Sequence, residues 1–346
     1  MTALHDRRIL LVRLSALGDV VHSLAALSTL RAARPGAEIG WLVEDRHAGL
    51  LEGHPQIDRL FVFRRRGGVG AVRDVRKELR AWRPDVAVDL QGNLKSGLLL
   101  RASGAPRRIG LPPGESREGS HVFATEHVAP GPTGEHRVAR GLRLVRALGQ
   151  MDARGAELPP VRADAAAAIG AALSARRIGA GRYAVLVPGT SAFGAFKRWP
   201  PARFGGLAQR IRDETGLVPL VSFGPGERPL ADAVVAAAAG AAEIAPETRS
   251  LHELIALVRG AGLVVGADSG PVAIAGVAGV PTVALFGPKD PAIYAPPGPR
   301  VHVVWKEVYC SPCTLRRCND PICMTTLRED EAWDAVARAA SGVRGS

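Results

Sequence analysis

Apolar runs of strand length alternate with helical patterns along this chain of 346 residues, and this alternation restricts the folds open to it. The first series begins with RILLVRL, the helical stretch VVHSLAALSTLRAA and EIGWLVE, and continues through LFVF and DVAVDL. A second series opens at YAVLVPG and continues through LVPLVSFG, LVVGADSG and TVALFG. Strands that alternate with helices form a parallel sheet covered by helices. We therefore predict an α/β protein with two Rossmann-like domains.

A linker rich in Pro and Ala, from about 150 to 182, separates the two series. We expect an N-terminal domain at 1–165, a C-terminal domain at 180–325, and a C-terminal helix at 326–346 that packs back on the N-terminal domain. The Pro- and Gly-rich stretch 110–135 is expected to be a loop. The topology matches GT-B, in which an inter-domain cleft holds the substrates, but two-domain dehydrogenases and epimerases share the pattern.

The chain is basic, with 45 Lys and Arg against 33 Asp and Glu and a net charge of +12. This excess favours an acidic partner, although an arginine-rich genome is an alternative cause. No nucleic-acid-binding module or aromatic platform is present, so we expect no nucleic-acid partner. The N-terminus, with Asp6, Arg7 and Arg8, lacks a signal-peptide pattern. The apolar region 263–286 is interrupted by Asp268, so we do not expect it to span a membrane. We predict a cytoplasmic protein whose membrane contact is peripheral.

Polar and basic side chains follow the strands of the first series. Asp19 comes just after the strand-to-helix loop 15–18, where it either caps the helix or faces a ligand. No GxGxxG is present at this turn, which argues against a dinucleotide. Gln91 and Lys95 follow a later strand, and LFVF is followed by Arg64, Arg65 and Arg66. These residues suit a substrate with carboxylates or phosphates, or else form a solvated rim.

Three loops of the second series carry residues suited to an anionic ligand. Two of these loops start helices whose N-termini favour a bound diphosphate, and the third places Glu227 where it would accept hydrogen bonds from a ribose. The alternative is a set of ordinary polar loops and helix caps. The candidate residues are Thr190, Ser191, Lys197, Glu227, Asp268, Ser269 and Gly270.

Five blocks resemble glycosyltransferase family 9, the ADP-heptose:lipopolysaccharide heptosyltransferases, in order and spacing. They are LLVRLSALGDVVHSLAAL, VDLQGNLKSGLLLR, VPGTSAFGAFKRWP, GADSGPVAIAGVAGVPTVALFGPKDP and CSPCTLRRCNDPICM. The resemblance implies an inverting glycosyltransferase that moves a heptose from ADP-heptose to the lipopolysaccharide inner core, on Kdo-lipid A or the first heptose. Alternatives are a GT-B enzyme for another nucleotide sugar and a catalytically idle relative that binds anionic glycolipid.

The resemblance also implies roles for individual residues. Asp19 matches the general base, and Lys197 matches the lysine that steadies the donor phosphates. Thr190, Ser191, Glu227 and the segment Asp268–Gly270 match donor-binding positions in a C-terminal donor domain. The N-terminal domain would bind the acceptor, an anionic glycolipid at the inner face of the inner membrane, through Arg64, Arg65, Arg66, Gln91 and Lys95. Catalysis would require no cofactor or metal.

This chain departs from the family pattern after its D-S-G-P motif. Met-His is common there, whereas Val272 and Ala273 follow Pro271, so any contact made by that histidine is absent. The loop before Lys197 is also slightly longer. These changes point to a donor pose, or a sugar, that differs from the usual one.

All four cysteines fall in one window, with the spacing Cys310-x2-Cys313-x4-Cys318-x4-Cys323. Four thiolates at short spacing are candidate ligands of a structural zinc or an iron-sulfur centre. The spacing is not that of paired CxxC zinc sites, and reduced thiols or local disulfides are the alternatives.

Overall fold

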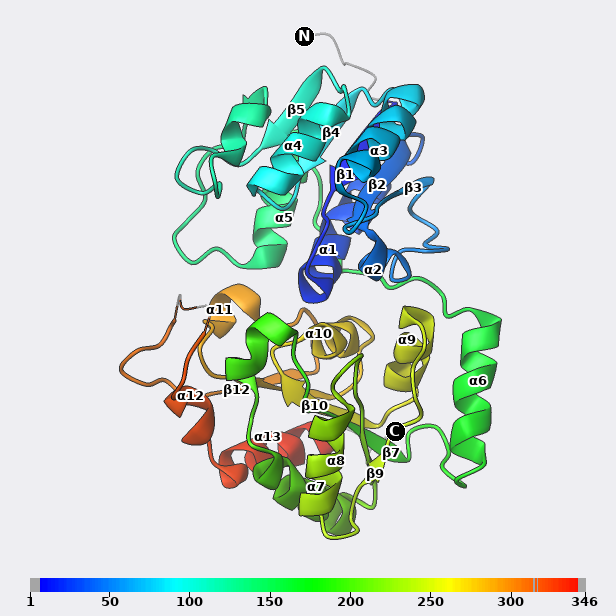
Figure 1. Ribbon diagram of the computed structural model, residues 1–346, viewed down its shortest axis with the longest axis vertical. Coiled ribbons are helices and arrows are strands. Elements are labelled where there is room, and N and C mark those ends of the chain that lie inside the picture. Colours follow the sequence, from blue (N-terminus) through cyan, green and yellow to red (C-terminus); the bar gives the residue numbers. More distant parts are fainter. Residues whose placement is uncertain (1–6, 314, 316, 342–346) are drawn as a thin grey trace. The chain divides into compact units, whose positions relative to one another are not determined.

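The computed structural model describes residues 7–313, 315 and 317–341. The chain divides into two compact units, residues 1–160 and 161–346 (Figure 1). Residues 1–6 and 342–346, at the ends of the predicted domain ranges, lie outside the described residues.

The first unit is a six-stranded parallel sheet with the order β3-β2-β1-β4-β5-β6. Its strands are β1 (Arg8–Val12), β2 (Glu38–Glu44), β3 (Arg59–Phe63), β4 (Val86–Asp89), β5 (Arg107–Gly110) and β6 (Glu126–His127). Its helices are α1 (Leu17–Ala33), α2 (Asp45–Ala48), α3 (Gly68–Trp82), α4 (Leu94–Ala102), the 3₁₀ helix η1 (Ser120–Phe123) and α5 (Arg137–Arg146). The stretch 110–135, predicted as a loop, contains η1 and the short β6, which pairs with β5.

Helices α3 and α4 bury their apolar stripes on the same core. Ala71, Val75 and Leu79 of α3 recur every four residues, which is the helical spacing, and they pack in one cluster with Leu99 and Leu100 of α4. Helix α1 packs against α5. The loops that follow β2, β1 and β4 leave neighbouring strands at one edge of the sheet, so the fold brings their side chains together.

The second unit repeats this order of strands as β12-β11-β10-β7-β8-β9. Its strands are β7 (Tyr183–Val187), β8 (Val218–Val221), β9 (Glu243–Ile244), β10 (Leu263–Ala267), β11 (Thr282–Phe286) and β12 (Val301–Trp305). Its helices are α6 (Ala163–Ser174), the 3₁₀ helix η2 (Ala192–Lys197), α7 (Pro201–Thr215), α8 (Arg228–Ala237), α9 (Leu251–Arg259), α10 (Gly270–Val277), α11 (Pro291–Tyr294), α12 (Ile322–Thr325) and α13 (Glu329–Ser341). The predicted α/β class with two Rossmann-like halves is confirmed.

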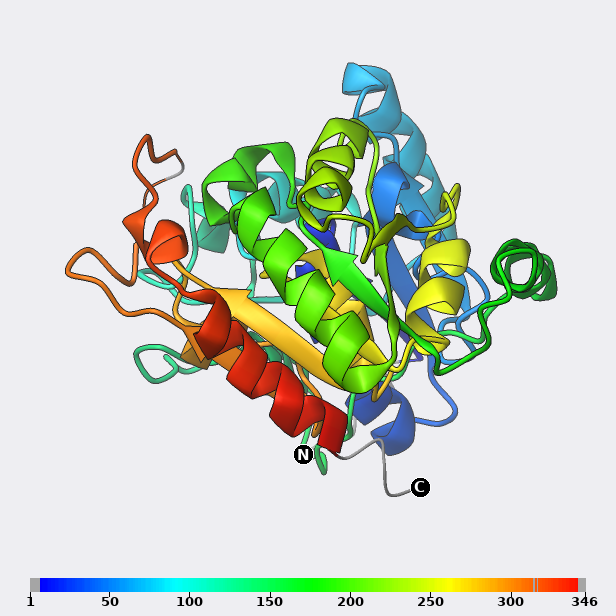
Figure 2. The same ribbon diagram turned by 90° about the horizontal axis from the view of Figure 1, so that it is seen from below.

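The first and last helices of the second unit differ from the predicted domain boundaries. Helix α13 lies beside α7 on the sheet of its own unit (Figure 2), with Ala332, Trp333 and Val336 in that unit's core. Helix α6, which the prediction left largely in the linker, packs against α9. In both cases an amphipathic helix buries its apolar stripe on the nearest uncovered surface.

No helix in the part of the chain that the structure describes is long and apolar enough to span a bilayer.

Candidate functional site

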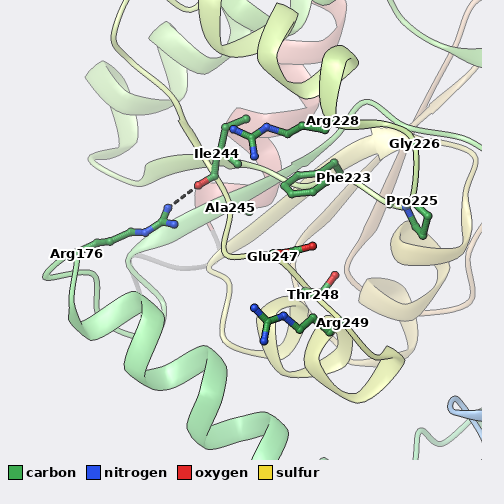
Figure 3. Close-up of a pocket in the computed structure, with 11 residues that line it drawn as sticks. Arg176, Phe223, Pro225, Gly226, Arg228, Ile244, Ala245, Glu247, Thr248 and Arg249 are labelled. Carbon is green, nitrogen blue, oxygen red and sulfur yellow. Dashed lines mark hydrogen bonds between the residues drawn. The ribbon is translucent and has the colours of Figure 1, made fainter.

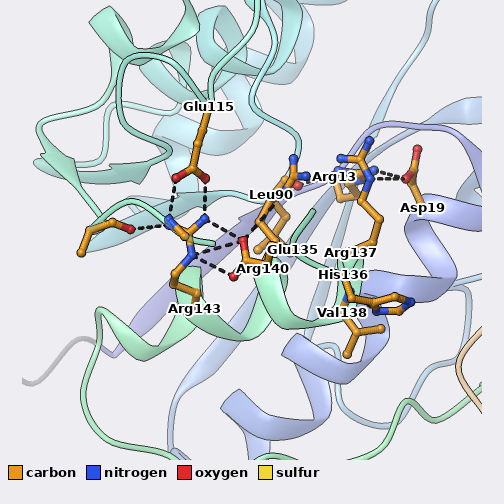
Figure 4. A network of polar contacts seen from close by, with 12 residues as sticks. Arg13, Asp19, Leu90, Glu115, Glu135, His136, Arg137, Val138, Arg140 and Arg143 are labelled. Carbon is orange, nitrogen blue, oxygen red and sulfur yellow. Dashed lines mark hydrogen bonds and ion pairs between the residues drawn. The ribbon is translucent and has the colours of Figure 1, made fainter. Parts of the chain in front are cut away.

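Asp19 lies in the first turn of α1, directly after the loop that follows β1. Its Oδ2 accepts a hydrogen bond from the backbone N–H of Ala16 at 3.4 Å. Its Oδ1 lies 2.8 Å from Nη2 of Arg13 and 3.8 Å from Nε of Arg137 (Figure 4). The N-cap residue of α1 is Ala16, so Asp19 closes the first turn from the third helical position and is not itself the N-cap. Its carboxylate also belongs to a cluster of charges.

The charge cluster sets the protonation of Asp19. Burial by itself would raise the pKa of this carboxyl, but Arg13 and then Arg137 outweigh burial and lower the pKa to about 2. Arg13 is held rigidly, because its side chain is buried and its Nη1 donates to the carbonyl oxygen of Leu90 at 2.6 Å. Asp19 is therefore ionised at any pH near neutrality.

Gln91, predicted to face the acceptor, contacts the loop that carries Asp19. Its Oε1 accepts hydrogen bonds from the backbone N–H groups of Leu14, at 2.8 Å, and Ser15, at 3.2 Å. These bonds join the loop after β4 to the loop after β1. Gln91 thus fixes the backbone next to Asp19.

Lys95 forms an ion pair at the same edge of the sheet. Its Nζ lies 2.9 Å from Oε1 of Glu44, whose Oε2 lies 2.9 Å from Nε of Arg46. The Glu44 side chain is only 1% exposed, so it holds both cations at the rim of the sheet. Arg64–Arg66 follow β3 in an exposed turn, and the ion pairs described around Asp19 do not include them.

A second group of ion pairs fixes the segment that leads to α5. Arg143 of α5 pairs with both Glu115 and Glu135, and Nη2 of Arg143 lies 2.8 Å from Oε2 of Glu135 (Figure 4). Arg137, which pairs with Asp19, is the first residue of the same helix. The sequence contained no signal for Arg13 or Arg137, because each finds Asp19 only through folding.

Lys197 and Asp268 lie together in the second unit. Nζ of Lys197, at the end of η2, is 2.7 Å from Oδ2 of Asp268, which follows β10. Strands β7 and β10 are neighbours in the sheet, so the loops that follow them meet at its carboxyl edge. Both side chains remain about one-fifth exposed, so they are accessible to a ligand.

Glu227 joins the loops that follow β7 and β8. Its Oε2 accepts from the backbone N–H of Gly224 at 3.0 Å, and its Oε1 lies 3.5 Å from Nη2 of Arg198. The backbone of Gly189 passes so close that a Cβ there would stand 2.1 Å from Oε2 of Glu227. Arg198 also donates to the carbonyl oxygen of Thr190 at 3.3 Å, and sequence reasoning did not identify this arginine.

The hydroxyl residues of this edge differ in what they contact. Thr190 is buried and donates through Oγ1 to the carbonyl oxygen of Gly194 at 2.7 Å, so it shapes its own loop. Ser191 is exposed. Ser269 is the N-cap residue of α10, and its buried Oγ has no hydrogen-bond partner among the described residues. Gly270 begins α10, whose first N–H groups favour an anion.

A cavity of about 740 Å³ lies beside the Glu227 loop (Figure 3). It is lined on one side by the segment from Phe223 to Gly226 and on the other by Glu247 and Thr248, with Arg228 and Arg249 at its walls. An aromatic ring, mixed charges and this volume suit a bound small molecule with a planar ring. The sequence did not predict this cavity because its walls come from loops after two different strands.

The four cysteines do not support the predicted metal centre. In the described part of the chain, no three His, Cys, Asp or Glu side chains converge as metal ligands. All four thiols are free, and Cys323 is buried in the core of the second unit, where burial above all raises its pKa to about 11. A backbone contact joins this segment to the loop after β11, since the Cys313 N–H donates to the Pro288 carbonyl oxygen at 2.6 Å.

Solved structures share this architecture over almost the whole chain. A family 9 glycosyltransferase from Veillonella parvula superposes with a TM-score of 0.83 at 22% identity, with 98% of each chain covered. The Escherichia coli ADP-heptose lps heptosyltransferase II gives a TM-score of 0.77 at 21% identity, with 98% of this chain and all of that chain covered. The fold is therefore GT-B.

Sequence comparisons agree with the structural ones. Lipopolysaccharide heptosyltransferase 1 of Pseudomonas aeruginosa is 29% identical over 321 residues, which are 90% of this chain and 87% of that protein. The model of the family described as "Glycosyltransferase family 9 (heptosyltransferase)" matches residues 72–322. Because that match covers most of both units, this chain belongs to glycosyltransferase family 9.

Proposed function

We propose that this chain is an inverting heptosyltransferase that transfers a heptose from ADP-heptose to an anionic glycolipid of the lipopolysaccharide inner core. The observation that carries the proposal is the pair of charged clusters, around Asp19 in one unit and around Lys197 in the other, in a chain of family 9. Relatives named lipopolysaccharide heptosyltransferase 1 support the sugar and the acceptor.

The donor would bind at the carboxyl edge of the second sheet. Lys197, the Ser269 hydroxyl and the first N–H groups of α10 would contact the diphosphate, and Glu227 would accept hydrogen bonds from the ribose. The cavity beside Phe223 would hold the base. An Escherichia coli heptosyltransferase solved with ADP, at a TM-score of 0.75 and 22% identity over 96% of this chain and 99% of that one, supports an adenine nucleotide.

The reaction makes one bond and breaks one. An acceptor hydroxyl oxygen bonds to the anomeric carbon, and the bond from that carbon to the diphosphate oxygen breaks on the opposite face, releasing ADP. Lys197 and the N-terminus of α10 stabilise the charge that develops on the leaving diphosphate, so no metal ion is needed for this step.

Asp19 takes the proton of the acceptor hydroxyl. A carboxylate with a pKa of about 2 is a weak base, but it is ionised at neutral pH and therefore ready to accept. The attacking oxygen becomes strongly acidic as it bonds to the anomeric carbon, so a weak base is sufficient at that stage. Arg64, Arg65, Arg66 and Lys95 would hold the anionic groups of the acceptor near this carboxylate.

Asp19→Ala tests the role of the base. We expect turnover to fall by about 10²- to 10⁴-fold while ADP-heptose binding is retained, because the donor cluster is untouched. ADP release with a deacylated acceptor measures turnover, and calorimetry measures donor binding. The exposed Asp152→Ala serves as the control and should keep normal turnover. Near-normal turnover of Asp19→Ala would show that Asp19 is not the general base.

The donor is tested separately with the unaltered protein. ADP-heptose, UDP-sugars and GDP-sugars are compared for release of the nucleoside diphosphate, with and without acceptor. Acceptor-dependent release from ADP-heptose alone is expected. Release from another nucleotide sugar would reassign the donor, and release from none would refute transferase activity.

A further inference from the structure

Exposed apolar side chains gather on one face of the first unit. Among the described residues, nine large apolar side chains are exposed, and five of them lie on α3, α4 and η1. These five are Val69 (87% exposed), Val72 (39%), Leu94 (43%), Leu98 (51%) and Val122 (67%). We call the surface formed by α3, α4 and η1 the α3–α4 face.

The three elements form one continuous surface. Helices α3 and α4 contact each other and lie side by side in Figure 1, and α4 also contacts η1. A Cβ on Gly97 of α4 would lie 2.6 Å from the ring of Phe123 in η1, which shows how closely these two elements pack. The Arg80 side chain of α3 lies 3.4 Å from the corresponding position on Gly104, just after α4.

The outer stripe of α3 combines apolar and basic side chains. Positions 69, 72, 73, 76 and 80 recur at helical spacing, so they share one side of the helix. They are occupied by Val69, Val72, Arg73, Arg76 and Arg80. The acidic residues of this helix, Asp74 and Glu78, lie outside this stripe by the same spacing.

The charge of the face is strongly positive. Residues 64–83 contain eight basic and two acidic side chains, and all eight basic ones are exposed. Helix α4 carries two basic side chains, Lys95 and Arg101, and no acidic one. Two acids contact the first residues of α4: Glu118, whose Oε2 accepts from the Leu94 N–H at 3.2 Å, and Glu44, which pairs with Lys95 at 2.9 Å.

A purely solvated helix face would carry the charges but not the five exposed apolar side chains. Apolar side chains set among arginines are typical of surfaces that bind anionic membranes, where the apolar groups enter the headgroup region and the cations pair with phosphates. We propose that the α3–α4 face docks on an anionic lipid bilayer. The inference uses the proposed function for one point only, that the acceptor is itself a lipid.

The location of the face fits this role. Helices α3 and α4 begin at the carboxyl edge of the sheet, the edge that also carries Lys95 and the loop of Asp19. Docking through these helices would therefore hold the proposed acceptor-binding edge close to the bilayer. The acceptor headgroup would reach the site while its acyl chains stay in the membrane.

Cosedimentation with vesicles tests the docking directly. The full-length protein is mixed with phosphatidylcholine vesicles with or without phosphatidylglycerol, and with no donor present. We expect binding to the anionic vesicles only. The double variant Val69→Asp/Leu98→Asp should bind at least about tenfold more weakly, because it removes two inserted groups and adds two repelled charges. Both positions are exposed, so the fold should be unaffected.

The control variant introduces two aspartates at exposed apolar positions outside the α3–α4 face. Tyr309→Asp/Leu315→Asp changes two exposed apolar side chains of the second unit, and it should bind vesicles as the unaltered protein does. The face variant should transfer normally to a deacylated acceptor and lose about tenfold in rate with acceptor embedded in vesicles.

Three results would overturn the docking proposal. The first is a failure of the unaltered protein to bind anionic vesicles, and the second is equal binding by the face variant. The third is self-association in sedimentation velocity without lipid that the face variant abolishes, which would assign the face to a second copy of the chain. Vesicle binding is measured without donor, so a failed donor screen leaves this test intact.

Discussion

At the scale of single residues, Asp19 combines its proposed catalytic role with a contribution to stability. Its carboxylate is ionised because Arg13 and Arg137 lie against it, and Arg13 is itself buried and in need of a counter-charge. Any substitution that removes the charge at position 19 therefore removes the ion-pair partner of a buried cation. Loss of activity in such a variant has to be separated from loss of fold.

The depressed pKa of Asp19 predicts a pH-dependent stability. The pKa falls from 3.8 to about 2 on folding, so the ionised carboxylate stabilises the fold above about pH 4, and this contribution is lost as the pH falls toward about 2. Asp19→Asn should lower the free energy of unfolding by roughly 2 kcal/mol at pH 7. The difference should shrink below about pH 4.

Urea denaturation at a series of pH values measures this difference. The exposed Asp152→Asn is the matched control, and it should stay within about 0.5 kcal/mol of the unaltered protein. A stability difference for Asp19→Asn that is the same at pH 3 and pH 7 would contradict the assignment of the low pKa to this carboxyl.

At the scale of elements, the second unit depends on close approach between two loops. Gly189, after β7, leaves room for the Glu227 carboxylate from the loop after β8. The carboxylate in turn contacts Gly224 and Arg198, so its position is fixed from several sides. A side chain at position 189 would displace the group that we propose to bind the ribose.

Gly189→Ala is expected to weaken nucleotide binding more than it weakens the fold. The added Cβ would lie 2.1 Å from Oε2 of Glu227, so the carboxylate must move, and we expect ADP affinity to fall by about tenfold through the loss of one charge-assisted hydrogen bond. Calorimetric titration with ADP measures the change. Gly170→Ala on α6, where a Cβ meets open space, should leave ADP affinity unchanged. Equal ADP affinity of Gly189→Ala and the unaltered protein would contradict the proposed role of Glu227.

Helix α13 is a structural part of the second unit. Trp333 is buried against that core, and the guanidinium carbon of Arg210 lies 4.6 Å from its ring centroid. Trp333→Ala should lower the free energy of unfolding by about 3 kcal/mol or more, because it leaves a large cavity. Urea denaturation measures this change, and a shift of the transition on addition of ADP would identify the unfolding of the second unit. The exposed Asp334→Ala is the control and should change the free energy of unfolding little. An unchanged stability of Trp333→Ala would place the helix outside the core.

At the scale of the whole molecule, the order of buried runs was sufficient to predict both halves of the fold. Strands such as β7 and β10 are apolar throughout and lie buried on both faces, which is the pattern that a central parallel strand produces. The packing of α13 on the second sheet could not be predicted from the sequence. Its amphipathic pattern indicates which side of the helix is buried, but not which surface that side contacts.

The candidate site stays a prediction, and the structure adds side-chain partners that the sequence did not indicate. Polar residues after strand ends identified Asp19, Lys197 and Asp268 as neighbours of a common edge in each unit, since parallel strands all end on one side. The pairing of Lys197 with Asp268 joins residues 71 positions apart, and that of Lys95 with Glu44 joins residues 51 apart. Such pairs depend on side-chain direction in the folded sheet, which spacing along the chain does not encode.

The contact between Lys197 and Asp268 has a consequence for ligand selection. A phosphate that approaches Lys197 meets an ammonium group already engaged by a carboxylate 2.7 Å away, so binding exchanges one anion for another. A lone phosphate competes with Asp268 on nearly equal terms. A ligand that also reaches the start of α10 and the Glu227 loop makes additional contacts, and these favour its binding over the Lys197–Asp268 ion pair. We therefore expect the Asp268 carboxylate to favour extended nucleotide ligands over free phosphate at the proposed donor site.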